Sequence, residues 1–141
     1  MFKELEILAN LNLNELMRLS VSHNSKELIN IVKSQLRDGK NTKGANIHPR
    51  YTGEYAAFKK QLSSYKANMG TPDLFLTGSF QNKIDINVNN DSVDYFSSDK
   101  KADDLEGRYN SAPLLGIMPE NKSKVHFLND STLIKKICEK L

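Results

Sequence analysis

The sequence predicts an α+β fold, in which a small antiparallel β-hairpin or sheet packs against several helices. Apolar and polar residues alternate over residues 83–88 and again over 92–97, on either side of an Asn-Asn-Asp turn. This pattern indicates a hairpin with one buried face. Most of the remaining chain shows helical periodicity, with Ser, Asn, Gly and Pro at the expected boundaries. Because an isolated hairpin is marginally stable in water, helices or a partner chain must cover it.

The length of 141 residues fits one domain. We expect residues 1–141 to form it, with the helical segment 1–24 available as an assembly arm. Hydrophobic residues make up 38% of the chain and its mean hydropathy is −0.54, which is typical of a polar globular protein. Its apolar runs are too short to span a membrane, and the first residues lack the apolar core of a signal peptide. We therefore expect folding in the cytosol and no membrane contact.

Helical periodicity predicts three helices in the first half. Residues 2–19 carry leucines at near-helical spacing, although three asparagines weaken the middle of this segment. After a polar break at 20–25, Asn24 and Glu27 form a capping box for a helix over 25–38, and Gly39 ends it. A polar loop follows over 39–52. The third helix spans 53–66, and its predicted apolar stripe is Tyr55, Phe58, Leu62 and Tyr65.

The second half predicts shorter elements around the hairpin. Thr77 caps a helical turn that places Leu76, Phe80 and Ile84 on one face. After the hairpin, Ser98 caps a helix over 99–109 whose inward residues are Ala102, Leu105 and Tyr109. Residues 114–118 are apolar and extended, and Pro119 suits the first turn of another helix. The last predicted helix spans 131–141, with Leu133, Ile134, Ile137 and Leu141 as its apolar face.

Neither catalytic residues nor metal ligands form a recognisable pattern. The three histidines (His23, His48 and His126) lack metal-binding spacing, and we expect them at the surface or in loops. The single cysteine, Cys138, excludes an intramolecular disulfide and is expected to pack as a small apolar residue. Asp99 and Asp103 share a face of the predicted helix, but we favour an acidic surface over acid–base catalysis. We therefore expect no enzyme activity, no metal and no cofactor.

Charged residues are divided into a basic and an acidic block. Residues 33–66 hold eight basic side chains against two acidic ones, a balance of +6, and residues 73–106 hold eight acidic against three basic ones, a balance of −5. In a ring, different surfaces of neighbouring subunits meet, and opposite charges would fix their register. The alternative is that both blocks compensate within one subunit. The candidate subunit contacts are Lys33, Arg37, Lys40, Lys43, Arg50, Lys59, Lys60, Asp85, Asp91, Asp94, Asp99, Asp103 and Asp104.

The basic block also suggests nucleic-acid binding. Aromatic and basic residues interleave over residues 50–66, a pattern that can stack on bases and neutralise phosphates. The aromatic residues of this segment equally form an ordinary core stripe, which we favour. A nucleic-acid-binding accessory protein that uses residues 33–66 remains the alternative function.

A set of short motifs recurs in a fixed order along residues 27–141. These motifs are QLxxGK (35–40), YxxxxxxxK (51–59), LxLTGxFxxxI (74–84), the hairpin, KAxxLxxxY (101–109) and GIxPEN (116–121). Their order resembles the neck and tail-completion proteins of tailed bacteriophages, particularly those of crAss-like phages of gut Bacteroides. Residues 2–19 match this family only loosely, and the loop 110–118 lacks the aromatic residue expected before Gly116.

The resemblance implies a structural protein of the virion. Such a protein forms an oligomeric ring around the DNA channel in the phage neck and joins the portal to the tail. The expected partners are sister copies, the portal and neighbouring neck or tail proteins, with passing contact to genomic DNA. The protein would be synthesised in the host cytoplasm and incorporated into virions. We expect the hairpin 83–97 and the N-terminal segment at the subunit contacts, where a hairpin edge can pair with another chain.

Overall fold

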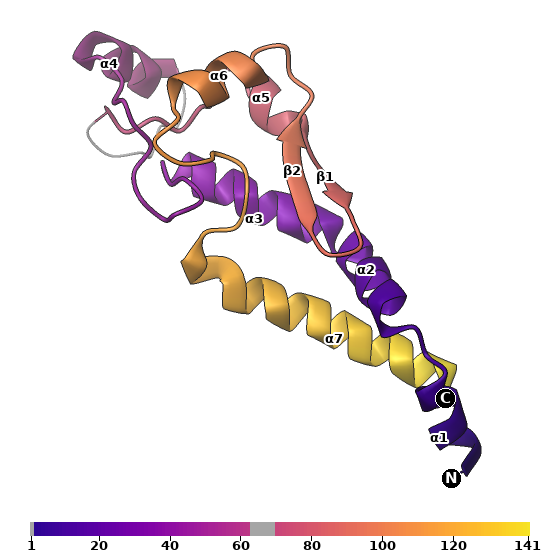
Figure 1. The fold of residues 1–141 in the computed structure, drawn as a ribbon. Helices are drawn as coiled ribbons and strands as arrows, with labels where there is room; N and C mark the ends of the chain where they lie inside the picture. The colour runs from indigo at the N-terminus through magenta and orange to yellow at the C-terminus, as the bar shows by residue number, and fades with distance from the viewer. Residues whose placement is uncertain (1, 63–69) are drawn as a thin grey trace.

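The computed structural model describes residues 2–62 and 70–141 as a set of helices around one hairpin. Figure 1 shows their arrangement along an elongated molecule. In chain order the elements are α1 (Phe2–Ala9), α2 (Leu13–His23), α3 (Ser25–Arg37), α4 (Gly53–Leu62), α5 (Ser79–Asn82), β1 (Ile84–Val88), β2 (Val93–Ser97), α6 (Ala102–Arg108), the 3₁₀ turn η2 (Pro119–Asn121) and α7 (Lys122–Lys140). The predicted α+β class is confirmed.

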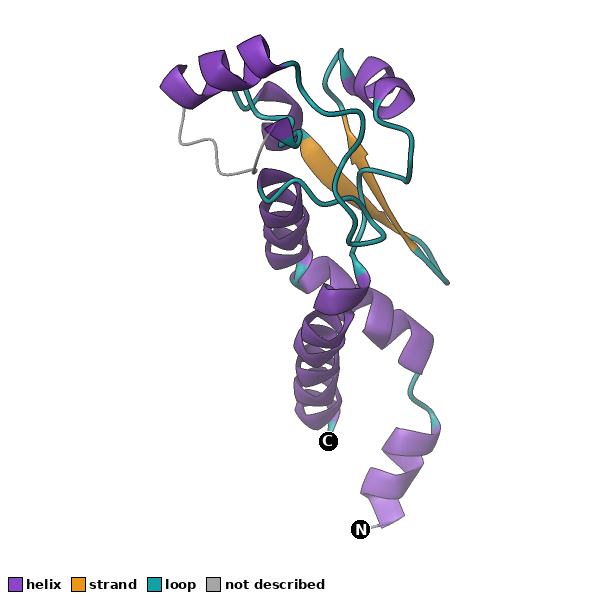
Figure 2. Cartoon of the chain, turned by 90° about the vertical axis from the view of Figure 1, so that its left-hand side faces the viewer, coloured by secondary structure: helices purple, strands orange, loops and turns teal. Residues whose placement is uncertain are grey.

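The molecule has two regions that differ in packing. The body comprises α3 to η2 and contains the hairpin, which lies beside α3 (Figure 1). The stem comprises α1, α2 and α7, with α2 and α7 packed side by side. Figure 2 shows the same division from another side, with both ends of the chain in the stem.

The hairpin forms as the alternation predicts. Its strands pair antiparallel, from Ile84 opposite Ser97 to Val88 opposite Val93, and residues 89–92 form the turn. Ile84 is buried and Tyr95 is half-buried, while Asp85 and Asp94 on the other face are exposed. One face therefore packs on the helices and the other faces solvent.

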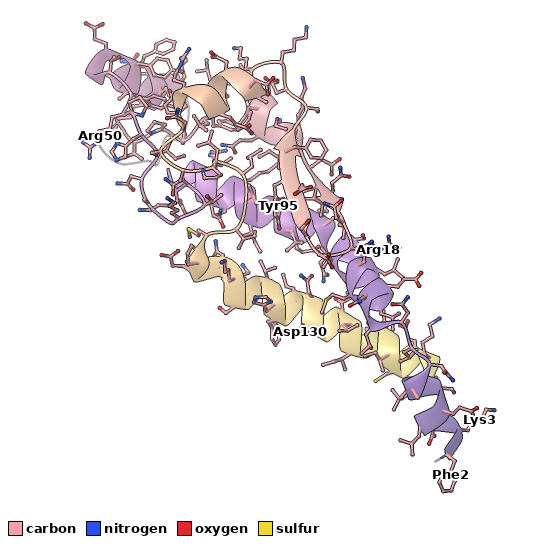
Figure 3. All side chains as sticks on the ribbon, in the orientation of Figure 1. Phe2, Lys3, Arg18, Arg50, Tyr95 and Asp130 are labelled. Carbon is pink, nitrogen blue, oxygen red and sulfur yellow. The ribbon has the colours of Figure 1, made fainter. Side chains whose placement is uncertain are left out.

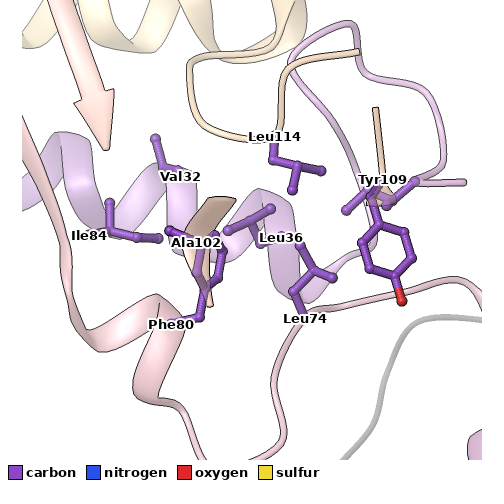
Figure 4. Close-up of a cluster of buried hydrophobic side chains, with 9 residues drawn as sticks. Val32, Leu36, Leu74, Phe80, Ile84, Ala102, Tyr109 and Leu114 are labelled. Carbon is purple, nitrogen blue, oxygen red and sulfur yellow. The ribbon is translucent and has the colours of Figure 1, made fainter. Parts of the chain in front are cut away.

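A single cluster of apolar side chains holds the body together (Figure 4). Its members come from α3, the loop after it, the segment around α5, β1, α6 and the loop that follows. They are Val32, Leu36, Ile47, Leu74, Phe80, Ile84, Ala102, Tyr109 and Leu114. The predicted inward positions of α6 are confirmed, since Leu105 also packs against this cluster.

Gly39 ends α3 as predicted. Its φ of 74° lies in the left-handed region, where glycine avoids the steric cost of a Cβ. The amides of Gly39 and Lys40 donate to the carbonyls of Leu36 and Gln35, so the last turn of α3 is closed by backbone bonds. The chain can then turn back into the loop that carries Ile47.

The N-terminal half departs from the predicted boundaries. The predicted helix over 2–19 is two helices, because α1 ends at Ala9 and Asn12 caps α2 by accepting a hydrogen bond from the Glu15 amide at 3.1 Å. The predicted break at 20–25 is helical up to His23, and the Ser20 hydroxyl donates to the Leu16 carbonyl inside α2. The predicted capping box at Asn24 is wrong, since its side chain makes no capping bond to α3.

The short helix before the hairpin also differs from its prediction. α5 begins at Ser79, and Gly78, with φ 86°, occupies the cap position predicted for Thr77. Phe80 and Ile84 are buried, but Leu76 is exposed and does not share their face. Ser98 makes no capping bond to α6, because that helix starts only at Ala102. The side chain that accepts a backbone amide just before α6 is Asp99, which bonds to the Lys101 amide.

The final helix is longer than predicted and buries a different face. η2 leads directly into α7, so the helix predicted after Pro119 and the one predicted over 131–141 are continuous. Ile134 and Leu141 are exposed, although both belong to the predicted apolar face. The buried residue is Asn129, and Leu128, Thr132 and Leu133 beside it are half-buried. Polar side chains therefore occupy part of the contact with α2.

Candidate assembly surfaces

A buried ion pair joins the basic block to the acidic block inside one chain. Lys59 of α4 contacts the Asp73 carboxylate, and each residue is only 1% exposed. The Tyr51 hydroxyl lies 3.3 Å from the Lys59 Nζ and 3.4 Å from the Asp73 Oδ1, and it accepts the Leu74 amide at 3.0 Å. This arrangement satisfies both buried charges and leaves neither available to a neighbouring subunit.

Burial changes the proton affinity of this cluster. Desolvation lowers the pKa of Lys59, while the hydrogen bond and the charge of Asp73 oppose that change. Burial also raises the pKa of Tyr51, so its hydroxyl stays protonated and can act as donor and acceptor. Leu74, with a φ of 55°, is held in the left-handed region next to these groups.

The placement of Lys59 corrects two predictions. Lys59 cannot belong to a subunit-contact surface, because it is enclosed by its own chain. The predicted aromatic stripe of α4 is also wrong, since Phe58 and Leu62 are exposed while Lys59 is the buried residue of this helix. Tyr55 is half-buried, and Tyr65 lies outside the described residues. Lys66, another member of the basic block, also lies outside them.

The other basic candidates are distributed over separate parts of the body. Lys43, Arg50 and Lys60 are exposed, and Lys33 is half-buried on α3. The Arg37 guanidinium lies 4.0 Å from the centre of the Phe75 ring, and the Lys40 amine donates to the Asn46 Oδ1 at 2.8 Å. Figure 3 shows Arg50 projecting away from the loop before α4.

Most acidic candidates lie at the surface. Asp85, Asp91, Asp94, Asp103 and Asp104 are exposed. Asp104 pairs with Arg108 on α6 at 3.2 Å, and Asp94 accepts a hydrogen bond from Asn89 in the hairpin turn. These carboxylates remain accessible to a partner.

Asp99 differs from the other acidic candidates because it is half-buried and its carboxylate has three partners within the chain. It accepts hydrogen bonds from the Ser79 hydroxyl and the Lys101 amide, and Lys83 lies 3.4 Å away. The Ser79 bond, followed by the Lys101 bond and the charge of Lys83, holds the pKa of Asp99 below its usual range. Asp99 precedes α6, so it does not share a helix face with Asp103 as predicted.

A second buried polar contact joins α3 to the segment before α7. The Gln35 amide donates to the Gly116 carbonyl at 2.7 Å, and its oxygen accepts from the Met118 amide at 3.1 Å and the Asn121 side chain at 2.9 Å. These residues belong to the motifs QLxxGK and GIxPEN. Tyr51 and Lys59 are likewise the two fixed positions of the motif YxxxxxxxK. Both contacts thus give these motifs a physical role in joining distant segments of the body.

Known proteins provide no match to this chain. None of the protein families, curated sequences or solved structures compared with it matches. Within residues 2–62 and 70–141, no helix is long and apolar enough to cross a membrane. The same residues contain no group of three or more His, Cys, Asp and Glu side chains able to hold a metal ion.

The stem carries apolar side chains that the sequence analysis did not assign to a surface. α1 has no buried residue, and its Phe2 is 83% exposed, with Leu5 and Leu8 also exposed. On α7, Phe127 is 73% exposed and Ile134 is 61% exposed. Phe127, Ile134 and Leu141 are seven residues apart, and this interval could have indicated one shared helix face.

Cys138 lies on the same exposed side of α7. The prediction that it packs as a small apolar residue is wrong, because Cys138 is exposed. The three histidines are exposed, as expected. The candidate surfaces for a partner are therefore the apolar sides of α1 and α7, together with the exposed charges of the body.

Proposed function

We propose that this chain is a structural protein of a tailed bacteriophage, which assembles into a ring in the neck and joins the portal to the tail around the DNA channel. The observation that carries the proposal is the exposed apolar surface of the stem. α1 and α7 each expose several large apolar side chains, and such a group of exposed apolar residues is typical of an interaction surface. The ordered motifs that resemble neck and tail-completion proteins support the virion context.

The proposed mechanism is complementarity of shape and charge between copies, without chemical turnover. The exposed carboxylates of the hairpin and α6 provide one acidic surface, and Lys43 and Lys60 provide basic positions for a neighbour. The hairpin edge offers unpaired backbone groups for strand addition. Lys59 is buried and therefore takes no part in the proposed contact between copies.

The oligomeric state of the purified chain tests the proposal. Native mass spectrometry across a concentration series and negative-stain imaging should reveal closed rings of one copy number. Peptide mass spectrometry of purified virions should detect the chain at a stoichiometry that matches the ring. A chain that stays monomeric at high concentration and is absent from virions would contradict the proposal.

The same samples distinguish the proposed neck protein from the alternative, a nucleic-acid-binding accessory protein. A nucleic-acid-binding accessory protein would be monomeric and would bind single-stranded DNA with an affinity that falls steeply as salt increases. Burial of Lys59 removes one positive charge from the surface available to DNA. Ring formation together with weak, salt-insensitive binding would favour the neck protein.

A further inference from the structure

The geometry of the stem points to a specific contact between copies. We infer that α1 of one copy docks on the outer side of α7 of the next copy, which deepens the proposed function by naming the elements that link the ring. The outer side of α7 is defined here by Phe127, Ile134, Cys138 and Leu141. These four residues are all exposed.

α1 extends beyond any helix of its own chain. The Asn24 side chain bonds to the Leu128 carbonyl and to the Asn129 and Thr132 side chains, so the end of α2 lies beside the middle of α7. From there the two helices run antiparallel for eleven residues each, about 16 Å, and they finish level with one another. α1 therefore lies past the C-terminal end of α7, as Figures 1 and 2 show.

Among the described residues, no other helix or strand packs extensively against α1. It has eight residues, and a helix this short is not stable alone in water. Phe2, Leu5 and Leu8 are three residues apart and form one apolar stripe. We assign the complementary helix surface to a second copy of the chain.

The outer side of α7 also lacks a partner in its chain. The side of α7 that faces α2 carries Asn129, whereas Phe127 and Ile134 lie on the opposite side by the 100° rotation per residue of a helix. Figure 3 shows neighbouring Asp130 turned away from α2. An apolar strip from Phe127 to Leu141 is about 21 Å long, enough for the stripe of α1.

Charge identifies the two helices as partners. α1 carries Lys3, Glu4 and Glu6, a balance of −1, and Glu6 flanks its apolar stripe. α7 carries five lysines against Asp130 and Glu139, a balance of +3. Lys124 and Lys135 flank the apolar strip on one side of the helix, and Asp130 flanks it on the other. Contact between the negatively charged α1 and the lysine side of this strip favours this pairing over α1 against α1 or α7 against α7.

The contact is heterologous, since it joins two different surfaces. Each copy can donate its α1 and receive the α1 of another copy, so repeated contacts form a ring where the rotation between copies closes. The same chain folded back on itself cannot make this contact, because α1 lies past the end of its own α7.

Cys138 provides a probe of the contact, since it is the only cysteine of the chain. Mild oxidation of an equimolar mixture of the Leu8→Cys, Cys138→Ala double variant with the native chain should give a disulfide between position 8 and position 138, located by peptide mass spectrometry. The control mixture contains a Leu62→Cys, Cys138→Ala variant in place of the Leu8→Cys variant. Leu62 is exposed, as Leu8 is, but it lies on α4. This mixture should give no cross-link between positions 62 and 138.

Charge exchange supplies an independent test in the assembled protein. The Glu6→Lys variant and the Lys135→Glu variant should each weaken assembly about two- to fivefold, and the double variant should recover most of it. Ile134→Asp should abolish the ring, whereas Leu62→Asp should leave it intact.

The outcomes distinguish this inference from the proposed function. Rings that form without a link between positions 8 and 138, and that tolerate Ile134→Asp, overturn the docking of α1 while the ring function stands. The single variant Leu8→Cys keeps the native Cys138. If it forms a disulfide between positions 8 and 138 within one molecule at high dilution, the docking of α1 on another copy is also overturned. A chain that remains monomeric and shows no cross-link overturns both.

Discussion

The body and the stem differ in the charged groups that they bury and in the apolar surface that they leave exposed. In the body, Lys59, Asp73 and Gln35 are buried, and each has hydrogen-bond partners within the chain. In the stem, the exposed residues include phenylalanine, isoleucine and leucine, and α1 buries nothing. The body also exposes single apolar side chains such as Phe58 and Leu76, but in the stem such residues line one side of α1 and one side of α7. This difference teaches that the buried polar contacts hold the body together, whereas the stem is the region that we propose for assembly.

The largest effect is expected from breaking the buried ion pair. Lys59→Met removes the cation and leaves the Asp73 carboxylate buried without it, which should lower the free energy of unfolding by about 3–5 kcal/mol. Urea denaturation of dilute protein measures this change. Lys60→Met at the exposed neighbouring position should change the free energy by less than about 0.5 kcal/mol.

A double variant sharpens this result. Lys59→Met combined with Asp73→Asn removes both charges, and the asparagine oxygen can still accept the Phe75 amide that Asp73 now binds at 3.2 Å. We expect this variant to be more stable than Lys59→Met alone. Equal stability of the two variants would show that the unpaired carboxylate is not the cause of the loss.

A smaller effect is expected at the Gln35 contact. Gln35→Leu keeps the volume of the side chain but leaves the Gly116 carbonyl and the Met118 amide without their partner, at a cost of about 1–3 kcal/mol. Thermal and urea unfolding measure the loss. Ser34→Ala, at an exposed position of the same helix, serves as the control and should be close to neutral. A neutral Gln35→Leu variant would contradict the view that this contact fastens the body.

The Asp99 carboxylate provides a test by titration. Its pKa is lower in the folded chain than in the unfolded chain, so Asp99 stabilises the fold at pH values above about 4, and this contribution is lost as the pH falls through the folded pKa. Ser79→Ala removes the principal hydrogen bond, and the pKa should rise toward 3.8. Carboxyl NMR titration measures it. Ser98→Ala should leave the pKa of Asp99 unchanged.

The smallest effect on stability is expected in α1. Leu5→Ser exposes no core and breaks no buried contact, so unfolding of the dilute monomer should change by less than about 0.5 kcal/mol. Assembly at high concentration should nevertheless fail, as measured by native mass spectrometry. A clear loss of monomer stability would show that α1 packs on its own chain and would remove the contrast between body and stem.

Local patterns in the sequence predicted the parts of the fold that depend on local rules. The alternation of Ile84, Ile86 and Val88 located β1, and Gly39 located the end of α3, because strand faces and left-handed caps depend on a few adjacent residues. The inward residues of α6 were predicted for the same reason.

Contacts between distant segments were not predictable in this way. Asn24 was interpreted as a helix cap, but its amide instead bonds to residues 104 to 108 positions away on α7. Lys59 was assigned to the surface because lysine is rarely buried, and only the position of Asp73 explains why it lies inside. Ile134, Cys138 and Leu141 on the outer side of α7 were assigned to the core, since an apolar helix face is the same in sequence whether its own chain or another one covers it.

The pairing of α2 with α7 has a consequence for the order of folding. Asn24 and Asn129 are 105 residues apart, so at about 5–20 residues per second α2 leaves the ribosome roughly 5–20 s before its partner helix is made. During that interval Leu16 and Val21, which are buried in the finished protein, have no α7 to cover them. The body can complete its own contacts earlier, and the stem is then the last part of the chain to fold and the part most exposed to misassembly in a crowded translating cell.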